Sequence, residues 1–196
     1  MKNDLKFWIW LSSLTNIPVA KRKQILDFYE APENLWKEEY KALAANPLIN
    51  KKYVEIILDQ KRRDECSYIH EKLLKSNVKI LTIHDERYPR LLKDIYDPPL
   101  VLYCKGKMKK TEPCIAIVGS RRATSYGVDT ATKLAYEISK YGIAVVSGMA
   151  RGIDTAAHKG ALRGQGRTIA VLGCGIDIVY PQENKKLMSE IIEDGA

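Results

Sequence analysis

Three segments of this sequence combine glycine with arginine or hydroxyl side chains, and each follows a short apolar run. The segments are Gly119–Arg122, Ser147–Asp154 and Gly173–Asp177. Glycine allows the backbone to turn sharply and lets an anion approach the amide hydrogens. Arg121, Arg122 and Arg151 add full positive charges. This combination of residue types predicts a binding site for phosphate groups.

The apolar runs predict parallel strands that position these segments. The runs are Ile115–Val118, Ile143–Val146 and Thr168–Leu172. Each is short, continuous and partly β-branched, as in strands buried on both faces of a parallel sheet. We expect helices between them over Val128–Lys140, with Leu134, Ala135 and Ile138 facing inward, and over Thr155–Arg163. This alternation predicts an α/β fold containing half of a Rossmann-like parallel sheet.

In such sheets ligands bind beyond the carboxyl ends of the strands, where all three glycine segments would lie. Helices that begin after the segments would add the positive ends of their dipoles. The predicted nucleic-acid-binding residues are Gly119, Ser120, Arg121, Arg122, Ser147, Gly148, Arg151, Gly152, Gly173 and Gly175. For Arg121 an alternative stays open, namely an ion pair with Asp154 or Asp177 that holds neighbouring turns together.

The motifs of common phosphate-bearing cofactors are absent from the sequence. No GxGxxG follows the first strand, no acidic residue ends the second strand, and no GxxxxGK[ST] occurs. The four cysteines form no CxxC pair, so we expect neither a metal nor a cofactor. A linear polyphosphate chain such as a nucleic-acid backbone fits arginines and bare amides better than a dinucleotide does.

Asp154 and His158 lie four residues apart and would share a helix face. They could form a catalytic or metal-binding pair. The alternative makes Asp154 the N-cap of the Thr155–Arg163 helix, which ends at Gly164, with His158 packed or bonded nearby. We favour the cap because a metal site needs more ligands than these two. We therefore expect no catalytic residue.

Residues 1–77 predict a small all-helical module, and residues 78–196 the α/β domain. Helices are expected over Asp4–Leu14, after Pro18, over Asn34–Ala44 and over Lys51–Ser76. Arg22 should face solvent between Lys21 and Lys23, whereas Ile69 should be buried. The net charge is +8, the isoelectric point is about 9.2, and residues 1–110 carry +7 of that charge. Such a basic chain makes a nucleic-acid partner worth considering.

The motifs resemble those of the DNA-processing protein A family (DprA, also called Smf). The matching segments are Asp85–Leu92, Pro98–Tyr103, Ile115–Gly127, Val146–His158, Gly160–Asp177 and Tyr180–Asn184. The resemblance is dense from about residue 78 to residue 195. It is looser over residues 1–77, where the family often has a module resembling a sterile-alpha-motif or helix-hairpin-helix domain.

The resemblance implies a role without catalysis. Family members bind single-stranded DNA in the cytoplasm during natural transformation, protect it, and help to load the RecA recombinase. The family's Gly-Ser-Arg motif falls on Gly119, Ser120 and Arg121, whereas Arg151 occupies a variable position. Members normally continue past the position of residue 196, so we expect an incomplete sheet here. Their homodimer surface lies in that later part.

Two other functions stay open. A Rossmann-like nucleoside-monophosphate phosphoribohydrolase of the lysine-decarboxylase-like (LOG) group would carry a Pro-Gly-Gly-x-Gly-Thr motif, which this sequence lacks. A metal-dependent nickase would need a cluster of carboxylates, and none is evident. No run approaches the roughly 20 apolar residues of a membrane helix, and no secretion signal is recognised, so we expect a cytoplasmic protein.

Overall fold

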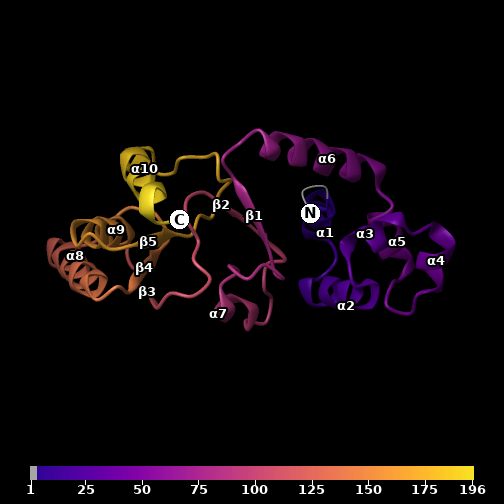
Figure 1. The fold of residues 1–196 in the computed structure, drawn as a ribbon, viewed down its shortest axis with the longest axis horizontal. Coiled ribbons are helices and arrows are strands. Elements are labelled where there is room, and N and C mark those ends of the chain that lie inside the picture. The colour runs from indigo at the N-terminus through magenta and orange to yellow at the C-terminus, as the bar shows by residue number, and fades with distance from the viewer. Residues whose placement is uncertain (1–3) are drawn as a thin grey trace. The chain divides into compact units, whose positions relative to one another are not determined.

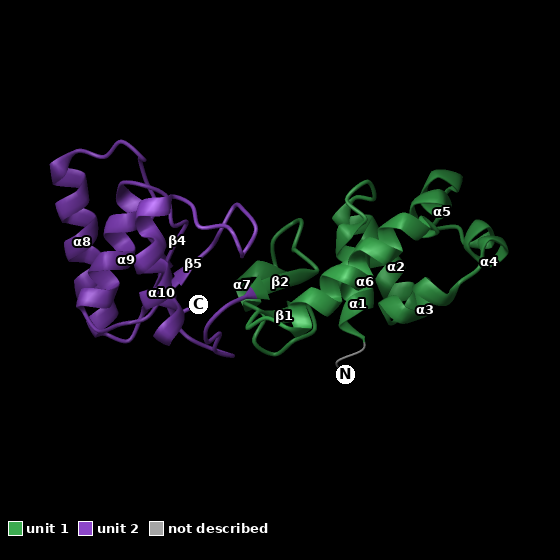
Figure 2. Cartoon of the chain, turned by 90° about the horizontal axis from the view of Figure 1, so that it is seen from above, with its two compact units in different colours: residues 1–103 green, residues 104–196 purple. Residues whose placement is uncertain are grey.

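The computed structural model describes residues 4–196 and divides the chain into two compact units (Figure 2). Unit 1 comprises residues 1–103 and unit 2 residues 104–196. Ile83, Leu100 and Val101, which follow residue 78 in the sequence, share the hydrophobic core of the helices in unit 1. The domain boundary predicted between residues 77 and 78 of this chain stays a prediction.

Unit 1 consists mainly of short helices around one apolar core (Figure 1). The helices are α1 (Leu5–Ser13), α2 (Val19–Tyr29), α3 (Pro32–Lys37), α4 (Tyr40–Ala45), α5 (Lys51–Ile57), α6 (Gln60–Leu74) and α7 (Arg90–Lys93). Trp10, Leu14 and Ile17 are fully buried in this core. Strands β1 (Lys79–Thr82) and β2 (Val101–Cys104) pair in a two-stranded sheet.

The long helix expected over residues 51–76 is two helices. The carboxylate of Asp59 accepts the backbone amide of Arg62 at 3.2 Å and caps a new helix, α6. Cys66 and His70, four residues apart, form the buried stripe of α6, so Ile69 is exposed and its predicted burial is wrong. A local cap therefore overrides a continuous helical pattern.

The prediction that Arg22 faces solvent is also wrong, because its side chain is only 6% exposed. Its guanidinium donates to the carbonyl oxygens of Leu11, Ser12 and Ile17 at 3.3, 2.6 and 3.0 Å. The last carbonyls of a helix have no partner within the helix, and Arg22 satisfies those at the end of α1. Burial lowers the pKa of Arg22.

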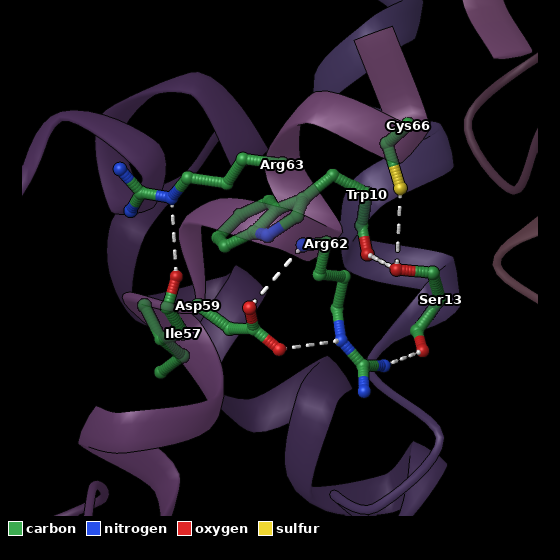
Figure 3. A network of polar contacts seen from close by, with 7 residues as sticks. All are labelled: Trp10, Ser13, Ile57, Asp59, Arg62, Arg63 and Cys66. Atoms are coloured by element: carbon green, nitrogen blue, oxygen red, sulfur yellow. Dashed lines mark hydrogen bonds and ion pairs between the residues drawn. The ribbon is translucent and has the colours of Figure 1, made fainter. Parts of the chain in front are cut away.

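A second group of polar contacts joins α1 to α6 (Figure 3). Arg62 donates to the carbonyl of Ser13 at 2.5 Å, and the Cys66 thiol donates to the Ser13 hydroxyl at 3.4 Å. Burial raises the pKa of that thiol. Arg63 lies over the Trp10 ring and donates to the carbonyl of Ile57 at 3.2 Å. These bonds hold the helices of unit 1 together.

Unit 2 has the predicted alternation of strands and helices, and the α/β fold with a preceding all-helical part is confirmed. Its elements are β3 (Cys114–Ala116), α8 (Ser125–Lys140), β4 (Ala144–Ser147), α9 (Ile153–Arg163), β5 (Thr168–Ala170), the 3-10 turn η1 (Gln182–Asn184) and α10 (Lys185–Asp194). The strands are parallel in the order β3-β4-β5. Ala116 pairs with Val146, and Val146 with Ile169.

The core between α8, α9 and β4 is built from small side chains. Ala135 of α8 packs with Ala157 and Ala161 of α9 over Val145 of β4, and Figure 1 shows the two helices side by side. A Cβ on Gly160 would overlap the carbonyl oxygen of Thr132, so the helices approach closely. The buried stripe of α8 is Ala131, Ala135 and Ser139. Leu134, expected to face inward, is 52% exposed.

Burial of the strands on both faces is confirmed only for the central one. Val145 of β4 is fully buried, whereas all three residues of β3 are exposed. The reason is position, because β3 lies at the edge of the described sheet. Within residues 4–196, no helix is both long and apolar enough to cross a membrane.

Candidate nucleic-acid interface

All three glycine segments lie beyond the carboxyl ends of the parallel strands. Residues 119–122 follow β3, residues 148–152 connect β4 to α9, and residues 173–177 follow β5. The backbone amide of Val171 still donates to Ser147 at 2.9 Å, so the ladder continues to the base of the turns. The fold therefore brings the predicted segments to one edge of one sheet, which we call the carboxyl edge.

A buried carboxylate holds the turn after β4. Oδ2 of Asp154 accepts the backbone amides of Gly148 and Ala150 at 3.2 and 3.3 Å. The helix α9 begins at Ile153 with Gly152 as its N-cap, so the prediction of Asp154 as N-cap is corrected. Asp154 is the second helical residue and binds amides of the preceding turn. The expected end of the helix at Gly164 is confirmed.

The turns after β3 and β4 interlock through Gly152. The amide of Ile153 donates to the carbonyl of Ser120 at 3.2 Å. Gly152 has a φ of +77°, and a Cβ there would overlap that same carbonyl oxygen. Only glycine adopts this positive φ without strain and leaves room for the Ser120 carbonyl oxygen. The first turn also folds on itself, because the amide of Arg122 donates to the Ser120 hydroxyl at 3.1 Å.

Two arginines of the first turn are exposed and lack ion-pair partners. Among residues 4–196, neither Arg121 nor Arg122 has a carboxylate within ion-pair distance, so the alternative pairing of Arg121 with Asp154 or Asp177 is not formed. The amides of Gly119 and Ser120 also have no hydrogen-bond acceptor within the described chain. This turn presents two guanidinium groups and bare amide hydrogens on the same short segment. Such a combination suits phosphate oxygens.

Arg151 differs from these two arginines. Its Nε donates to Oε1 of Glu183 at 2.5 Å, and both side chains are exposed. The hydrogen bond raises the pKa of Arg151 and lowers that of Glu183. The carboxylate therefore neutralises one of the cations predicted for the site. Glu183 lies in the matched Tyr180–Asn184 segment, but no sequence pattern indicated a role for it.

The remaining residues predicted to bind nucleic acid are partly buried and partly exposed to solvent. The Ser147 hydroxyl is buried and donates to the carbonyl of Ile117 at 2.7 Å, so it ties β4 to β3. Gly148 is exposed at the end of β4, and a Cβ on it would press on the Asp154 carboxylate. A Cβ on Gly173 would meet open space, whereas one on Gly175 would meet Asp177.

Asn184 supports the turn after β4 and is a residue that sequence reasoning missed. Its Nδ2 donates to the carbonyl of Met149 at 3.0 Å and to the Thr155 hydroxyl at 2.8 Å. The Thr155 hydroxyl in turn donates to Ala150 at 2.7 Å. Met149 has a φ of +60° and is fully buried. These bonds fix a turn whose backbone is strained.

His158 is fully buried under the sheet and not at the carboxyl edge. Its Nδ1 lies 2.7 Å from the Thr168 hydroxyl, which donates to the carbonyl of Val145 at 2.7 Å. Since that hydroxyl has given its hydrogen, Nδ1 must be the donor in the first bond. Burial lowers the pKa of His158 to about 4. His158 is therefore a neutral residue of the core, bonded nearby as expected.

Most of the net positive charge lies in unit 2, although a division of the sequence at residue 110 assigns most of it to the N-terminal part. Unit 2 carries 14 lysines and arginines against 9 acidic residues, or +5, and unit 1 carries 18 against 15, or +3. The stretch Lys105–Lys110 belongs to unit 2. Lys105 donates to the carbonyl of Ile176 at 3.0 Å, which supports the turn after β5. The unit with the carboxyl edge is thus the more basic one.

The fold and the site define an α/β protein that presents cations and free amides at one edge of a parallel sheet. Residues 79–196 match the model of the DNA recombination-mediator protein A family. Protein Smf of Synechocystis sp. is 36% identical to the chain over 198 residues, which cover 98% of this chain and 50% of the relative.

Solved structures give the same result. DprA from Streptococcus pneumoniae matches with a TM-score of 0.73 and 29% identity, covering 96% of this chain and 64% of that one. DNA processing protein A from Helicobacter pylori matches with a TM-score of 0.53 and 35% identity, covering 60% and 52%. The chain belongs to the DNA recombination-mediator protein A family, whose members are named DprA and Smf. It spans about half the length of the curated relatives that it matches.

Proposed function

We propose that this chain binds single-stranded DNA at the carboxyl edge of unit 2. The observation that carries the proposal is the turn after β3, where the exposed Arg121 and Arg122 lack carboxylate partners among residues 4–196. Guanidinium groups can donate two parallel hydrogen bonds to phosphate oxygens. The Helicobacter pylori relative binds single-stranded DNA, which supports the same ligand here.

The predicted residues take two roles in this proposal. Arg121, Arg122 and the amides of Gly119, Ser120 and Gly173 contact the phosphates. Gly148, Gly152, Gly175 and the Ser147 hydroxyl shape the turns, with Asp154 holding the amides of the β4 turn. Arg151 contributes to phosphate binding only when its pair with Glu183 opens. DNA binding of this kind depends on backbone charge and has little sequence preference.

Family membership supports a proposal for the biological role. We propose that the chain handles single-stranded DNA in the cytoplasm during natural transformation and recombination, protects it, and has RecA as its protein partner. It acts by binding and catalyses no reaction.

A competition titration tests the proposal. Polythymidine and a duplex of equal length compete for the protein at moderate salt. Single strands leave their phosphates and bases accessible, whereas the edge has no recognition helix for a groove, so polythymidine should displace the duplex. Equal affinity for both ligands, or no binding, would refute the assignment.

A further inference from the structure

We propose that Tyr126 is a base-stacking platform that gives the carboxyl edge its preference for single strands. The inference rests on the proposed function, since it adds a contact to the same DNA-binding edge. Phosphate contacts alone do not favour single strands, because a duplex carries the same phosphate groups at a higher charge density. A contact to the face of an unpaired base can do so.

Local contacts fix the backbone beneath Tyr126 at the carboxyl edge. Tyr126 is the second residue of α8 and lies five residues after Arg121. The Thr124 hydroxyl caps the helix by accepting the amide of Gly127 at 3.2 Å. The Ile153 side chain lies against both Gly119 and Gly127, since Cβ atoms built there would meet it at 2.8 and 3.4 Å. The first turn of α8 is therefore packed beside the arginine turn.

The aromatic ring itself is open to solvent. Tyr126 is 81% exposed, and within residues 4–196 its side chain has no hydrogen bond or ring contact. Val118 and Val171 are 69% and 60% exposed at the same edge. The register of the strands places these two valines on either side of Gly148, whose own side chain is absent. Apolar surface thus lies beside the two unpaired arginines, and apolar surface in water favours a partner.

This mixture of groups fits one ligand class. A single strand offers phosphates to Arg121 and Arg122 and an unpaired base face to the tyrosine. In a duplex the base faces are already covered by neighbouring pairs, so the ring has nothing to stack on. Stacking on an aromatic side chain changes affinity by roughly 5- to 150-fold per base. Arg121 would then set the salt dependence, and Tyr126 the strand preference.

The same helix supplies a matched control. Tyr141 follows the last residue of α8 and is 80% exposed, but the direction of the helix puts it at the opposite edge of the sheet. Tyr141 is thus the same residue type as Tyr126, is exposed to the same extent and belongs to the other end of the same helix. A general effect of removing an exposed tyrosine would appear in both variants, whereas stacking would appear only at Tyr126.

The experiment measures affinity for a thymidine oligomer and for an abasic oligomer of equal length, which keeps the phosphates and lacks the bases. The proteins are the native chain, Tyr126→Ala, Tyr126→Leu, Tyr126→Trp, Tyr141→Ala and Arg121→Ala, each with a melting curve. We expect the ratio of the two affinities to fall at least fivefold in Tyr126→Ala and Tyr126→Leu. Abasic binding should stay unchanged, and Tyr126→Trp and Tyr141→Ala should keep the ratio of the native chain.

Any result other than the expected one overturns the inference that Tyr126 is a stacking platform. An unchanged ratio in Tyr126→Ala, or an equal fall in Tyr141→Ala, shows that Tyr126 is no platform. If Arg121→Ala weakens both oligomers while Tyr126→Ala weakens neither, the proposed function stands and the platform fails. If the native chain binds neither oligomer, both fail. A loss of abasic binding in folded Tyr126→Ala would make the residue a support of the phosphate site instead.

Discussion

The Nε of Arg151 donates to Oε1 of Glu183 at 2.5 Å, whereas Arg121 has no carboxylate partner among residues 4–196. The two arginines lie at turns of the same edge, yet only one is free to meet an anion. A phosphate that approaches Arg151 must displace the carboxylate. Glu183 therefore competes with DNA for that cation.

Replacement of Glu183 by glutamine should strengthen DNA binding. Glu183→Gln removes the competing charge and frees Arg151, so the affinity for polythymidine should rise roughly two- to fivefold, which is the scale of an exposed ion pair. The slope of log affinity against log salt should steepen by about the amount expected for one phosphate contact. Arg151→Gln should lower the affinity by less than Arg121→Ala does. The measurement is a titration at several salt concentrations. Unchanged or weaker binding by Glu183→Gln would show that the pair serves only to hold the turns together.

Gly152→Ala should destabilise unit 2. An alanine at this position has a strained φ of +77°, and its Cβ overlaps the Ser120 carbonyl oxygen. We therefore expect the free energy of unfolding to fall by roughly 3 kcal/mol or more. Gly142 is the matched control, because its φ is +73° but a Cβ there meets nothing within 4 Å. Gly142→Ala should cost only the conformational strain of roughly 1–2 kcal/mol. Denaturant unfolding measures both, and equal losses would mean that the overlap relaxes without cost.

Stability should fall in mild acid because of His158. Its pKa is about 4 in the folded chain against 6.5 ordinarily, so the unfolded chain binds more protons between these values. Stability is therefore fully present above about pH 6.5 and declines as the pH falls toward 4, by about 3 kcal/mol at most. His158→Asn can keep a donor to Thr168 and does not titrate. The stability difference between the native chain and this variant should shrink as pH falls, and a constant difference would contradict the assignment.

Incubation with AMP should release no adenine. A phosphoribohydrolase would cleave the bond between base and ribose, whereas the Asp154 and Glu183 carboxylates at the carboxyl edge are already bound to turn amides and to Arg151. Chromatography of the incubation mixture measures the free base. Release of adenine that depends on the carboxyl edge, and that Arg121→Ala abolishes, would replace DNA binding with an enzymatic function.

The sequence predicted the α/β alternation and the common edge of the glycine segments, because both follow from short-range patterns. Predictions of burial were wrong where a side chain contacts residues that are distant in the sequence. Arg22 looked solvated between two lysines, but it satisfies the carbonyls at the end of α1. Leu134 looked buried by helical spacing, but the close approach of α8 and α9 selects the alanine stripe instead.

The candidate site shows the same limit. The residue types predicted phosphate binding, and the structure brings the segments together at one edge. Spacing alone could not show that Glu183, 32 residues later, neutralises Arg151, or that Asp154 binds turn amides rather than capping its helix. Those contacts depend on how the connections after β4 and β5 meet.

The central claim is that Arg121 binds the DNA backbone, and a salt titration of Arg121→Ala tests it most directly. Binding of polythymidine is measured for the native chain and the variant over a range of salt concentrations, with melting curves of the same preparations. We predict weaker binding, a slope of log affinity against log salt that is shallower by about 0.7, and an unchanged melting temperature. Native affinity and slope in a folded Arg121→Ala protein would contradict the account.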